Sequence, residues 1–129
     1  MSGRYVLDTN IVIALFANDT AVTSNLRNAQ EVFVPSTVVG ELYYGAQRSG
    51  RVKQNVAQID SFRAANTILV CDGATASVYG IVKNELRKKG RPIPENDIWI
   101  AAIALQHNLT LVTRDAHFKE VDGLQIEAW

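Results

Sequence analysis

The stretch RYVLDTNIVIALFA, residues 4–17, contains the features that decide the fold. It opens with a short apolar run of β character, Arg4–Leu7, and ends in an apolar segment, Ile11–Ala17, whose pattern predicts a helix. The polar turn between them, Asp8–Asn10, consists of residue types that cap helices. The chain therefore begins as a strand that leads through a polar turn into a helix, which is the first half of an α/β unit.

The same alternation continues to the end of the chain. Further strands are expected at residues 31–34, 67–70, 110–113 and 124–127, and further helices at residues 21–30, 37–48, 51–65, 74–89 and 95–107. The expected helix caps are Asp19 or Thr20, Ser36 and Asp72, and Gly90 is expected to end the helix 74–89. Short apolar strands separated by helices predict a mostly parallel sheet with helices on both faces, a three-layer α/β fold. In such folds the ligand lies beyond the carboxyl ends of the strands.

Length and composition predict one globular domain, residues 1–129, without a membrane segment. The longest apolar run, Ile98–Leu105, is far too short to cross a bilayer, and the N-terminus lacks the layout of a signal peptide. A single cysteine, Cys71, excludes an internal disulfide and favours a cytoplasmic location; we expect it to be buried. Because 13 basic and 13 acidic residues cancel, attraction for a nucleic acid would need a local basic patch or bound cations.

Four carboxylates stand near the predicted ligand edge: Asp8, Glu41, Asp97 and Asp115. Asp8 and Asp115 directly follow strands, where a cap or a turn would explain each one alone. Glu41 borders the apolar face of its helix, where a Glu is unusual unless it snorkels outward. Asp97 opens the most apolar helix, and although the helix dipole would explain an acid there, it adjoins the buried stretch more directly than Glu95 does.

As a set, these acids predict a metal site. Two carboxylates about 4 Å apart repel by roughly 4 kcal/mol at an effective dielectric constant of about 20, and no Lys, Arg or His stands beside all four in sequence. Mg²⁺ or Mn²⁺ would compensate the charge, because these ions prefer carboxylate and water oxygens. A carboxylate-held Mg²⁺ in an open site typically acts on phosphates.

Four segments that carry these acids resemble the four motifs of the PIN-domain nucleases in order and spacing, over the whole chain. They are Val6–Ile13, Pro35–Gly45, Leu86–Ala102 and Leu111–Phe118. The resemblance is greatest to the VapC-like toxins of bacterial toxin–antitoxin pairs. It implies a Mg²⁺-dependent endoribonuclease that is neutralised by a cognate antitoxin, a homodimer, and a five-stranded parallel sheet in the order 3-2-1-4-5.

The resemblance also implies roles for individual residues. Asp8, Glu41, Asp97 and Asp115 would be the catalytic and metal-binding acids, with one or two ions. We expect Asp8 and Asp97 to hold the principal ion, and Glu41 and Asp115 to complete its shell through water or to hold a second ion. The supporting polar residues would be Thr9, Asn10, Asn96 and Thr113. Many relatives have Asn where this chain has Arg114, which leaves the acids intact but alters the charge beside them.

A basic segment lies just upstream of the acidic residues of the third motif and includes Lys83 and Lys89. The residues expected to contact RNA or the antitoxin are Arg87, Lys88, Arg91 and Arg114. The alternative for the helical ones is a solvated helix end whose cations complement the dipole. The remaining residues of interest are expected to have structural roles: His117 in a surface turn, and Tyr43, Tyr44 and Trp99 as core or dimer contacts.

Two other functions stay open on the residues alone. A phosphatase with Asp8 as covalent nucleophile would also need Mg²⁺, but such enzymes usually carry a second Asp two residues on, where this chain has Asn10. A non-catalytic regulator with an acidic pocket, such as a receiver domain, would normally carry a Lys after a late strand, where this chain has Arg114 and Asp115.

Overall fold

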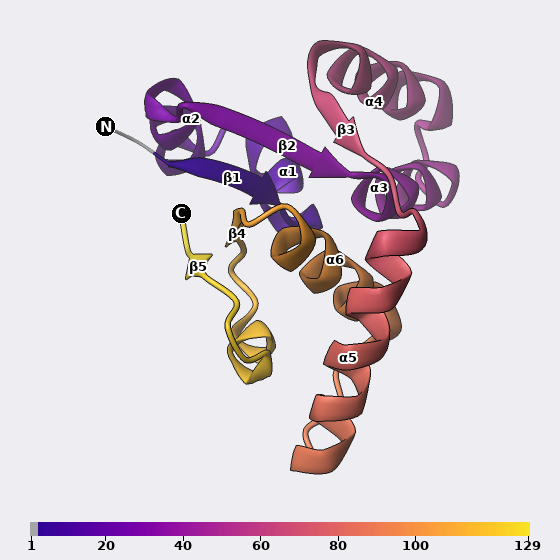
Figure 1. Ribbon diagram of the computed structural model, residues 1–129. Coiled ribbons are helices and arrows are strands. Elements are labelled where there is room, and N and C mark those ends of the chain that lie inside the picture. The colour runs from indigo at the N-terminus through magenta and orange to yellow at the C-terminus, as the bar shows by residue number, and fades with distance from the viewer. Residues whose placement is uncertain (1–2) are drawn as a thin grey trace.

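A computed structural model describes residues 3–129, in which strands and helices alternate as expected (Figure 1). The strands are Arg4–Leu7 (β1), Glu31–Pro35 (β2), Thr67–Leu69 (β3), Thr110–Val112 (β4) and Ile126–Glu127 (β5). The helices are Thr9–Phe16 (α1), Thr20–Asn28 (α2), Ser36–Gln47 (α3), Val52–Ala65 (α4), Gly73–Lys89 (α5) and Glu95–Gln106 (α6), with a 3₁₀ turn, Ala116–Glu120 (η1), between β4 and β5.

The sheet has the strand order β3-β2-β1-β4-β5, and every neighbouring pair is parallel. This confirms the order 3-2-1-4-5, with β1 at the centre. In the register of β1 and β4, Leu7 lies opposite Val112, and the backbone N–H of Asp8 donates to the carbonyl of Val112 at 3.0 Å. The residues that follow these two strands therefore emerge side by side at the carboxyl edge of the sheet.

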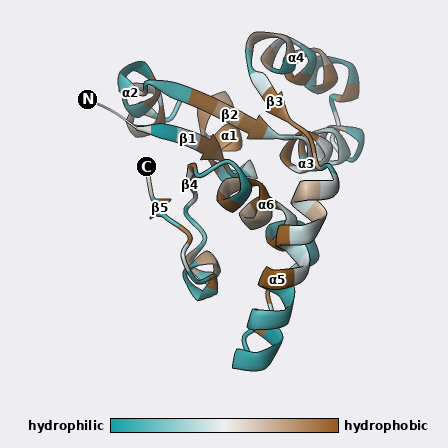
Figure 2. Ribbon diagram, viewed as in Figure 1, coloured by the Kyte–Doolittle hydropathy of each residue, from teal (hydrophilic) through white to brown (hydrophobic). Residues whose placement is uncertain are grey.

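The core forms where the central strands meet the helices. Val6, Leu111 and Ile100 are completely buried, and hydrophobic residues concentrate in β1, β2 and α6 (Figure 2). Helix α5 packs along α6, and α3 packs on α4, α1 and α6. The three-layer α/β class is thus confirmed. Because α6 is anchored by its buried apolar side chains, its N-terminal turn is rigidly held beside the carboxyl edge.

Side-chain caps set the starts of three of the six α-helices. Asp8 caps α1 and Asp19 caps α2, while Asp72 and Thr75 form a reciprocal capping box on α5. Gly90 ends α5 in a left-handed conformation, with φ of 69°, which glycine adopts without steric cost. The expected Ser36 cap is wrong, because α3 already begins at Ser36 and the preceding proline supplies no side-chain bond.

Other local expectations also differ from the structure. Strand β5 contains two residues rather than four. Cys71 is exposed rather than buried, because it lies in the loop between β3 and α5 instead of inside the sheet. Within residues 3–129, no helix combines the length and the apolar character that crossing a membrane would require.

Candidate active site

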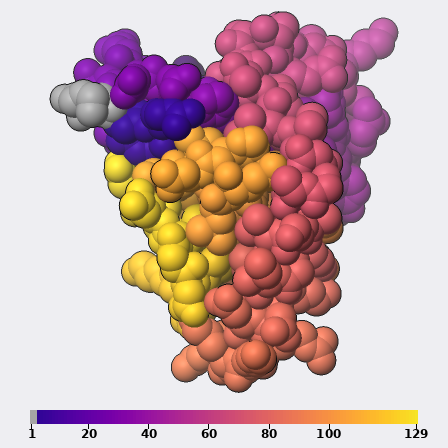
Figure 3. All heavy atoms as spheres, viewed as in Figure 1, coloured from indigo at the N-terminus to yellow at the C-terminus, as the bar shows by residue number. Residues whose placement is uncertain are grey.

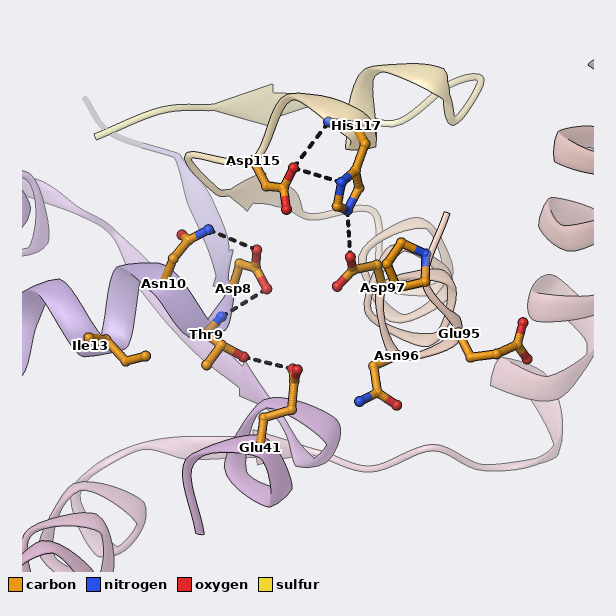
Figure 4. Close-up of a pocket in the computed structure, with 11 residues that line it drawn as sticks. Asp8, Thr9, Asn10, Ile13, Glu41, Glu95, Asn96, Asp97, Asp115 and His117 are labelled. Carbon is orange, nitrogen blue, oxygen red and sulfur yellow. Dashed lines mark hydrogen bonds and ion pairs between the residues drawn. The ribbon is translucent and has the colours of Figure 1, made fainter. Parts of the chain in front are cut away.

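All four sequence-predicted acids line one open cavity of about 540 Å³ (Figure 4). Each comes from a different part of the fold: the end of β1, the middle of α3, the first turn of α6 and the loop after β4. The residues that share the lining are Asp8, Thr9, Asn10, Ile13, Glu41, Pro94, Glu95, Asn96, Asp97, Asp115 and His117. The convergence that the sequence predicted is therefore present in the structure.

Asp8 is the most buried of these acids, with 5% of its surface exposed. Its carboxylate accepts hydrogen bonds from the Thr9 backbone N–H at 2.8 Å, the Thr113 hydroxyl at 2.8 Å and the Asn10 amide at 3.3 Å. Burial raises the pKa of Asp8 above its usual value, although the bonds from Thr113 and Thr9 lower it; the negative charges of Asp97 and Glu41 raise it further. Burial and the neighbouring acids therefore both disfavour the ionised form of the Asp8 carboxyl group.

Glu41 reaches the cavity from the apolar side of α3, as its position on the helix predicted. The Thr9 hydroxyl donates to Glu41 Oε1 at 2.8 Å, so the residue after Asp8 orients a second acid. Thr9 therefore supports two carboxylates at once, one through its backbone and one through its side chain.

Asp97 and Asp115 face each other across an imidazole that sequence reasoning had placed in a surface turn. His117 Nε2 lies 2.5 Å from Asp97 Oδ2, and Nδ1 lies 2.7 Å from Asp115 Oδ1 (Figure 4). The imidazole lies between the two carboxylates and turns one ring nitrogen toward each of them. His117 therefore belongs to the site, and the expectation of an unpartnered surface histidine is wrong.

The turn η1 explains this placement. Asp115 accepts the backbone N–H of His117 at 3.3 Å and so caps the 3₁₀ turn, which folds the histidine back over its own capping acid. A histidine two residues after a predicted site acid is the sequence signal that could have indicated this arrangement.

The supporting residues form a network around Asp8. Thr113, which is 1% exposed, donates to Asp8 and accepts the backbone N–H of Asp115 at 3.0 Å. The Asn10 side chain donates to Asp8 and accepts the backbone N–H of Arg114 at 3.3 Å. Asn96 lines the cavity without an interaction to the other residues drawn in Figure 4. These contacts tie the ends of β1 and β4 together.

The Arg114 side chain is engaged elsewhere. Its guanidinium donates to Asp19 Oδ2 at 2.9 Å and to the carbonyl of Trp129 at 2.8 Å, and it does not line the cavity. This pairing and the α2 cap lower the pKa of Asp19. The expected contact of Arg114 with RNA or antitoxin stays a prediction, and such a contact would have to break or share these bonds.

The other basic residues stand apart from the acids. Arg87 and Lys88 are exposed near the C-terminal end of α5, and Arg91 is exposed just beyond it; this end of the helix forms the lower tip of the molecule (Figure 3). Within residues 3–129, no Lys or Arg lines the acidic cavity. No described lysine or arginine therefore neutralises the four acids in the cavity. The roles of Arg87, Lys88 and Arg91 stay predictions.

Comparison with known proteins agrees with this geometry. Residues 5–124 match the PIN domain. The chain is 40% identical to Ribonuclease VapC2 of Haemophilus influenzae, with 98% of each chain covered. It is 33% identical to the tRNA(fMet)-specific endonuclease VapC of Shigella flexneri, again with 98% of each covered.

A solved structure gives the same picture. The chain superimposes with a TM-score of 0.89 and 33% identity on VapBC2 of Rickettsia felis, crystallised with a DNA fragment from its promoter, with 97% of this chain and 98% of that chain covered. This chain belongs to the PIN domain family.

Proposed function

We propose that this protein is a metal-dependent endoribonuclease and the toxin of a toxin–antitoxin pair. The observation that carries the proposal is the convergence of four carboxylates, from four separate elements, on one open cavity that no described Lys or Arg lines. Such a cavity suits a cation and a phosphate rather than a purely structural role. Two similar proteins are named as a ribonuclease and a tRNA-specific endonuclease, which supports the same activity.

The donor set fits a divalent cation. Asp97, Asp115 and His117 each offer a ligand atom, and these atoms lie within 4.8 Å of one another. Asp8 and Glu41 add carboxylate oxygens from the opposite side of the same cavity. We assign Mg²⁺ or Mn²⁺, as one or two ions, to this set. A bound ion of this kind lowers the pKa of a water molecule and stabilises charge on the phosphoryl oxygens.

The chain's own residues prepare the site for this chemistry. Three donors hold Asp8 in one orientation, and Thr9 holds Glu41, so little side-chain freedom is lost on binding. His117 lies between Asp97 and Asp115 and keeps the two carboxylates from facing each other directly.

The acidic lining also predicts how RNA binds. Without a cation, the phosphates of RNA would meet a lining of five carboxylates, the four site acids and Glu95, and no described lysine or arginine. RNA affinity should therefore rise on addition of Mg²⁺, in contrast to binding by a basic groove, which salts weaken.

Cleavage of single-stranded RNA and of initiator tRNA tests the activity. The wild type should cleave with Mg²⁺ or Mn²⁺ and stop with chelator, and Asp8→Asn, which keeps the helix cap, should remain folded and inactive. Glu85→Gln, an exposed change on α5, is the matched control and should cleave normally. Unchanged turnover of Asp8→Asn, or of the wild type in chelator, would refute the proposal.

The partner proposal needs a separate test. We expect the product of an adjacent small reading frame to copurify with this chain and to suppress cleavage. The chain alone should elute as a homodimer in light-scattering chromatography. A neighbouring product that neither binds nor inhibits would separate the nuclease proposal from the toxin proposal.

The two alternative functions fit the geometry less well. A covalent phosphatase would need a free acid at position 10, whereas the Asn10 amide donates to Asp8. A receiver domain would need a cation at the acidic pocket, whereas the guanidinium of Arg114 is bound to Asp19 and Trp129.

A further inference from the structure

The imidazole of His117 adds a nitrogen donor to a cavity whose other metal-binding groups are carboxylate oxygens. Among the described residues that line this cavity, His117 is the only histidine, and no cysteine is present. The side chains of His117 and Asp97 are 32% and 15% exposed, so both are open to the cavity. The four acids alone would give an all-oxygen site, and the nitrogen therefore changes which ions the site prefers.

Contacts on two sides fix the orientation of this ring. Asp115 Oδ1 lies 2.7 Å from Nδ1 and also accepts the backbone N–H of His117 at 3.3 Å. The next residue, Phe118, is completely buried, and its ring centroid lies 5.2 Å from that of the imidazole. The turn η1 is thus anchored both in the core and to Asp115, and it directs Nε2 toward Asp97 Oδ2, which is 2.5 Å away (Figure 4).

The two ring nitrogens therefore have different neighbours and suit different tasks. A neutral imidazole carries a hydrogen on one nitrogen and a lone pair on the other. Histidines that bind metals almost always donate this hydrogen to a carboxylate or another acceptor, which fixes the ring and makes the other nitrogen a better ligand. Asp115 stands in that supporting position at Nδ1. Nε2 is then the ligand atom, beside Asp97 and in the cavity that Asp8 also lines.

We propose that Nε2 of His117 is a direct ligand of the ion held by Asp97 and Asp8, that Asp115 supports this ligand from outside the metal's own shell, and that His117 makes the site prefer Mn²⁺ to Mg²⁺. This assignment rests on the proposed metal-dependent nuclease. The preference follows from the type of donor. Mg²⁺ takes oxygen ligands and keeps several waters, whereas an imidazole nitrogen is a ligand for transition-metal ions.

Pulsed electron paramagnetic resonance of the Mn²⁺-loaded protein tests the nitrogen ligand without reference to cleavage. The chain has two histidines, and His107 stands at the opposite end of α6 from Asp97, so a signal from histidine nitrogen can be assigned. Wild type produced with ¹⁵N-labelled histidine should show a coupling of ¹⁵N to Mn²⁺. His107→Gln should keep this coupling and His117→Gln should lose it. A Mn²⁺-loaded wild type without the coupling, or a coupling that persists in His117→Gln, would overturn the assignment.

Calorimetric titrations with Mn²⁺ and with Mg²⁺ test the preference between the two ions. His117→Gln should weaken Mn²⁺ binding about tenfold or more and Mg²⁺ binding about twofold or less. The ratio of the Mg²⁺ to the Mn²⁺ dissociation constant should therefore fall about fivefold or more, while His107→Gln, the matched control, should leave both constants unchanged. An equal loss of affinity for both ions, which is the effect of a merely structural role, would overturn the assignment.

Cleavage assays separate this assignment from the nuclease proposal. If the wild type cleaves RNA with metal but its bound Mn²⁺ shows no coupling to histidine nitrogen, the role of His117 as a ligand fails and the nuclease proposal stands. If Mn²⁺ binds through His117 but no RNA is cleaved, the ligand stands and the nuclease proposal fails. If the wild type binds neither ion, both fail.

Discussion

Replacing Thr113 by valine removes one hydroxyl from the centre of the site and leaves the shape of the side chain intact. The hydroxyl donates to Asp8 at 2.8 Å, accepts the Asp115 backbone N–H at 3.0 Å and lies 3.5 Å from the Asn10 amide. With only 1% of Thr113 exposed, water cannot replace the bond to Asp8. The variant therefore tests whether this network, rather than the sheet alone, holds the two central strand ends together.

The expected cost follows from the bonds that are lost. A hydrogen bond to a charged group contributes about 1.5–3 kcal/mol, and the N–H left without its partner adds about 1 kcal/mol. The total of about 3 kcal/mol should lower the melting temperature by roughly 10 °C in a domain of this size. Thr110→Val is the matched control, because the Thr110 hydroxyl, on β4, makes only an exposed 3.3 Å bond to the side chain of Gln125, and it should shift the melting temperature by about 2 °C or less.

The pH dependence of metal binding should shift upward in Thr113→Val. The Thr113 bond favours ionised Asp8 and so opposes the effect of burial; without it the pKa of Asp8 rises further. Because the metal binds the ionised carboxylate, the pH of half-maximal metal binding should move upward in Thr113→Val and return toward the wild-type value in Thr113→Ser. Metal titrations at several pH values, read by differential scanning fluorimetry, measure both effects. A melting shift no larger than that of Thr110→Val, or an unmoved pH profile, would refute the reasoning.

Three more predictions follow from the same cluster. Mg²⁺ or Mn²⁺ should stabilise the wild type by about 2.7 kcal/mol at a hundredfold excess over the dissociation constant, and a full response in Asp97→Asn by scanning fluorimetry would contradict the assigned ligands. Because burial makes folded Asp8 bind its proton more tightly than the unfolded chain does, Asp8 should contribute stability below its unfolded pKa that is lost as pH rises through its folded value. In chelator, the melting temperature of Asp8→Asn minus that of the wild type should thus increase with pH. A difference that stays constant with pH would contradict the raised pKa of Asp8. His117→Ala should lower metal-free stability by about 1 kcal/mol, since the imidazole is partly solvated, and it should also reduce the stabilisation by metal, because one of the assigned ligand atoms is lost. A full wild-type response to metal in thermal melts of this variant would argue against His117 as a ligand.

The strand and helix pattern could be predicted because it follows from the spacing of apolar residues along the chain. Each strand is a short apolar run, and α6 is apolar around most of its circumference, so burial alone determines where they lie. The acids at the ends of β1 and β4 could also be placed, because parallel strands present their carboxyl ends at one edge. The PIN resemblance then supplied the strand order and the roles of the four acids.

Sequence by itself determined the order of strands and helices along the chain and which acids stand at the ligand edge, since both follow from neighbours a few positions away. Tertiary structure alone decided that His117 bridges Asp97 and Asp115 and that Arg114 turns toward Asp19 and Trp129. Polar side chains in loops take their direction from distant partners: Arg114 and Asp19 are 95 positions apart. No local pattern encodes such pairs, because their energy exists only after the sheet has brought the strand ends together.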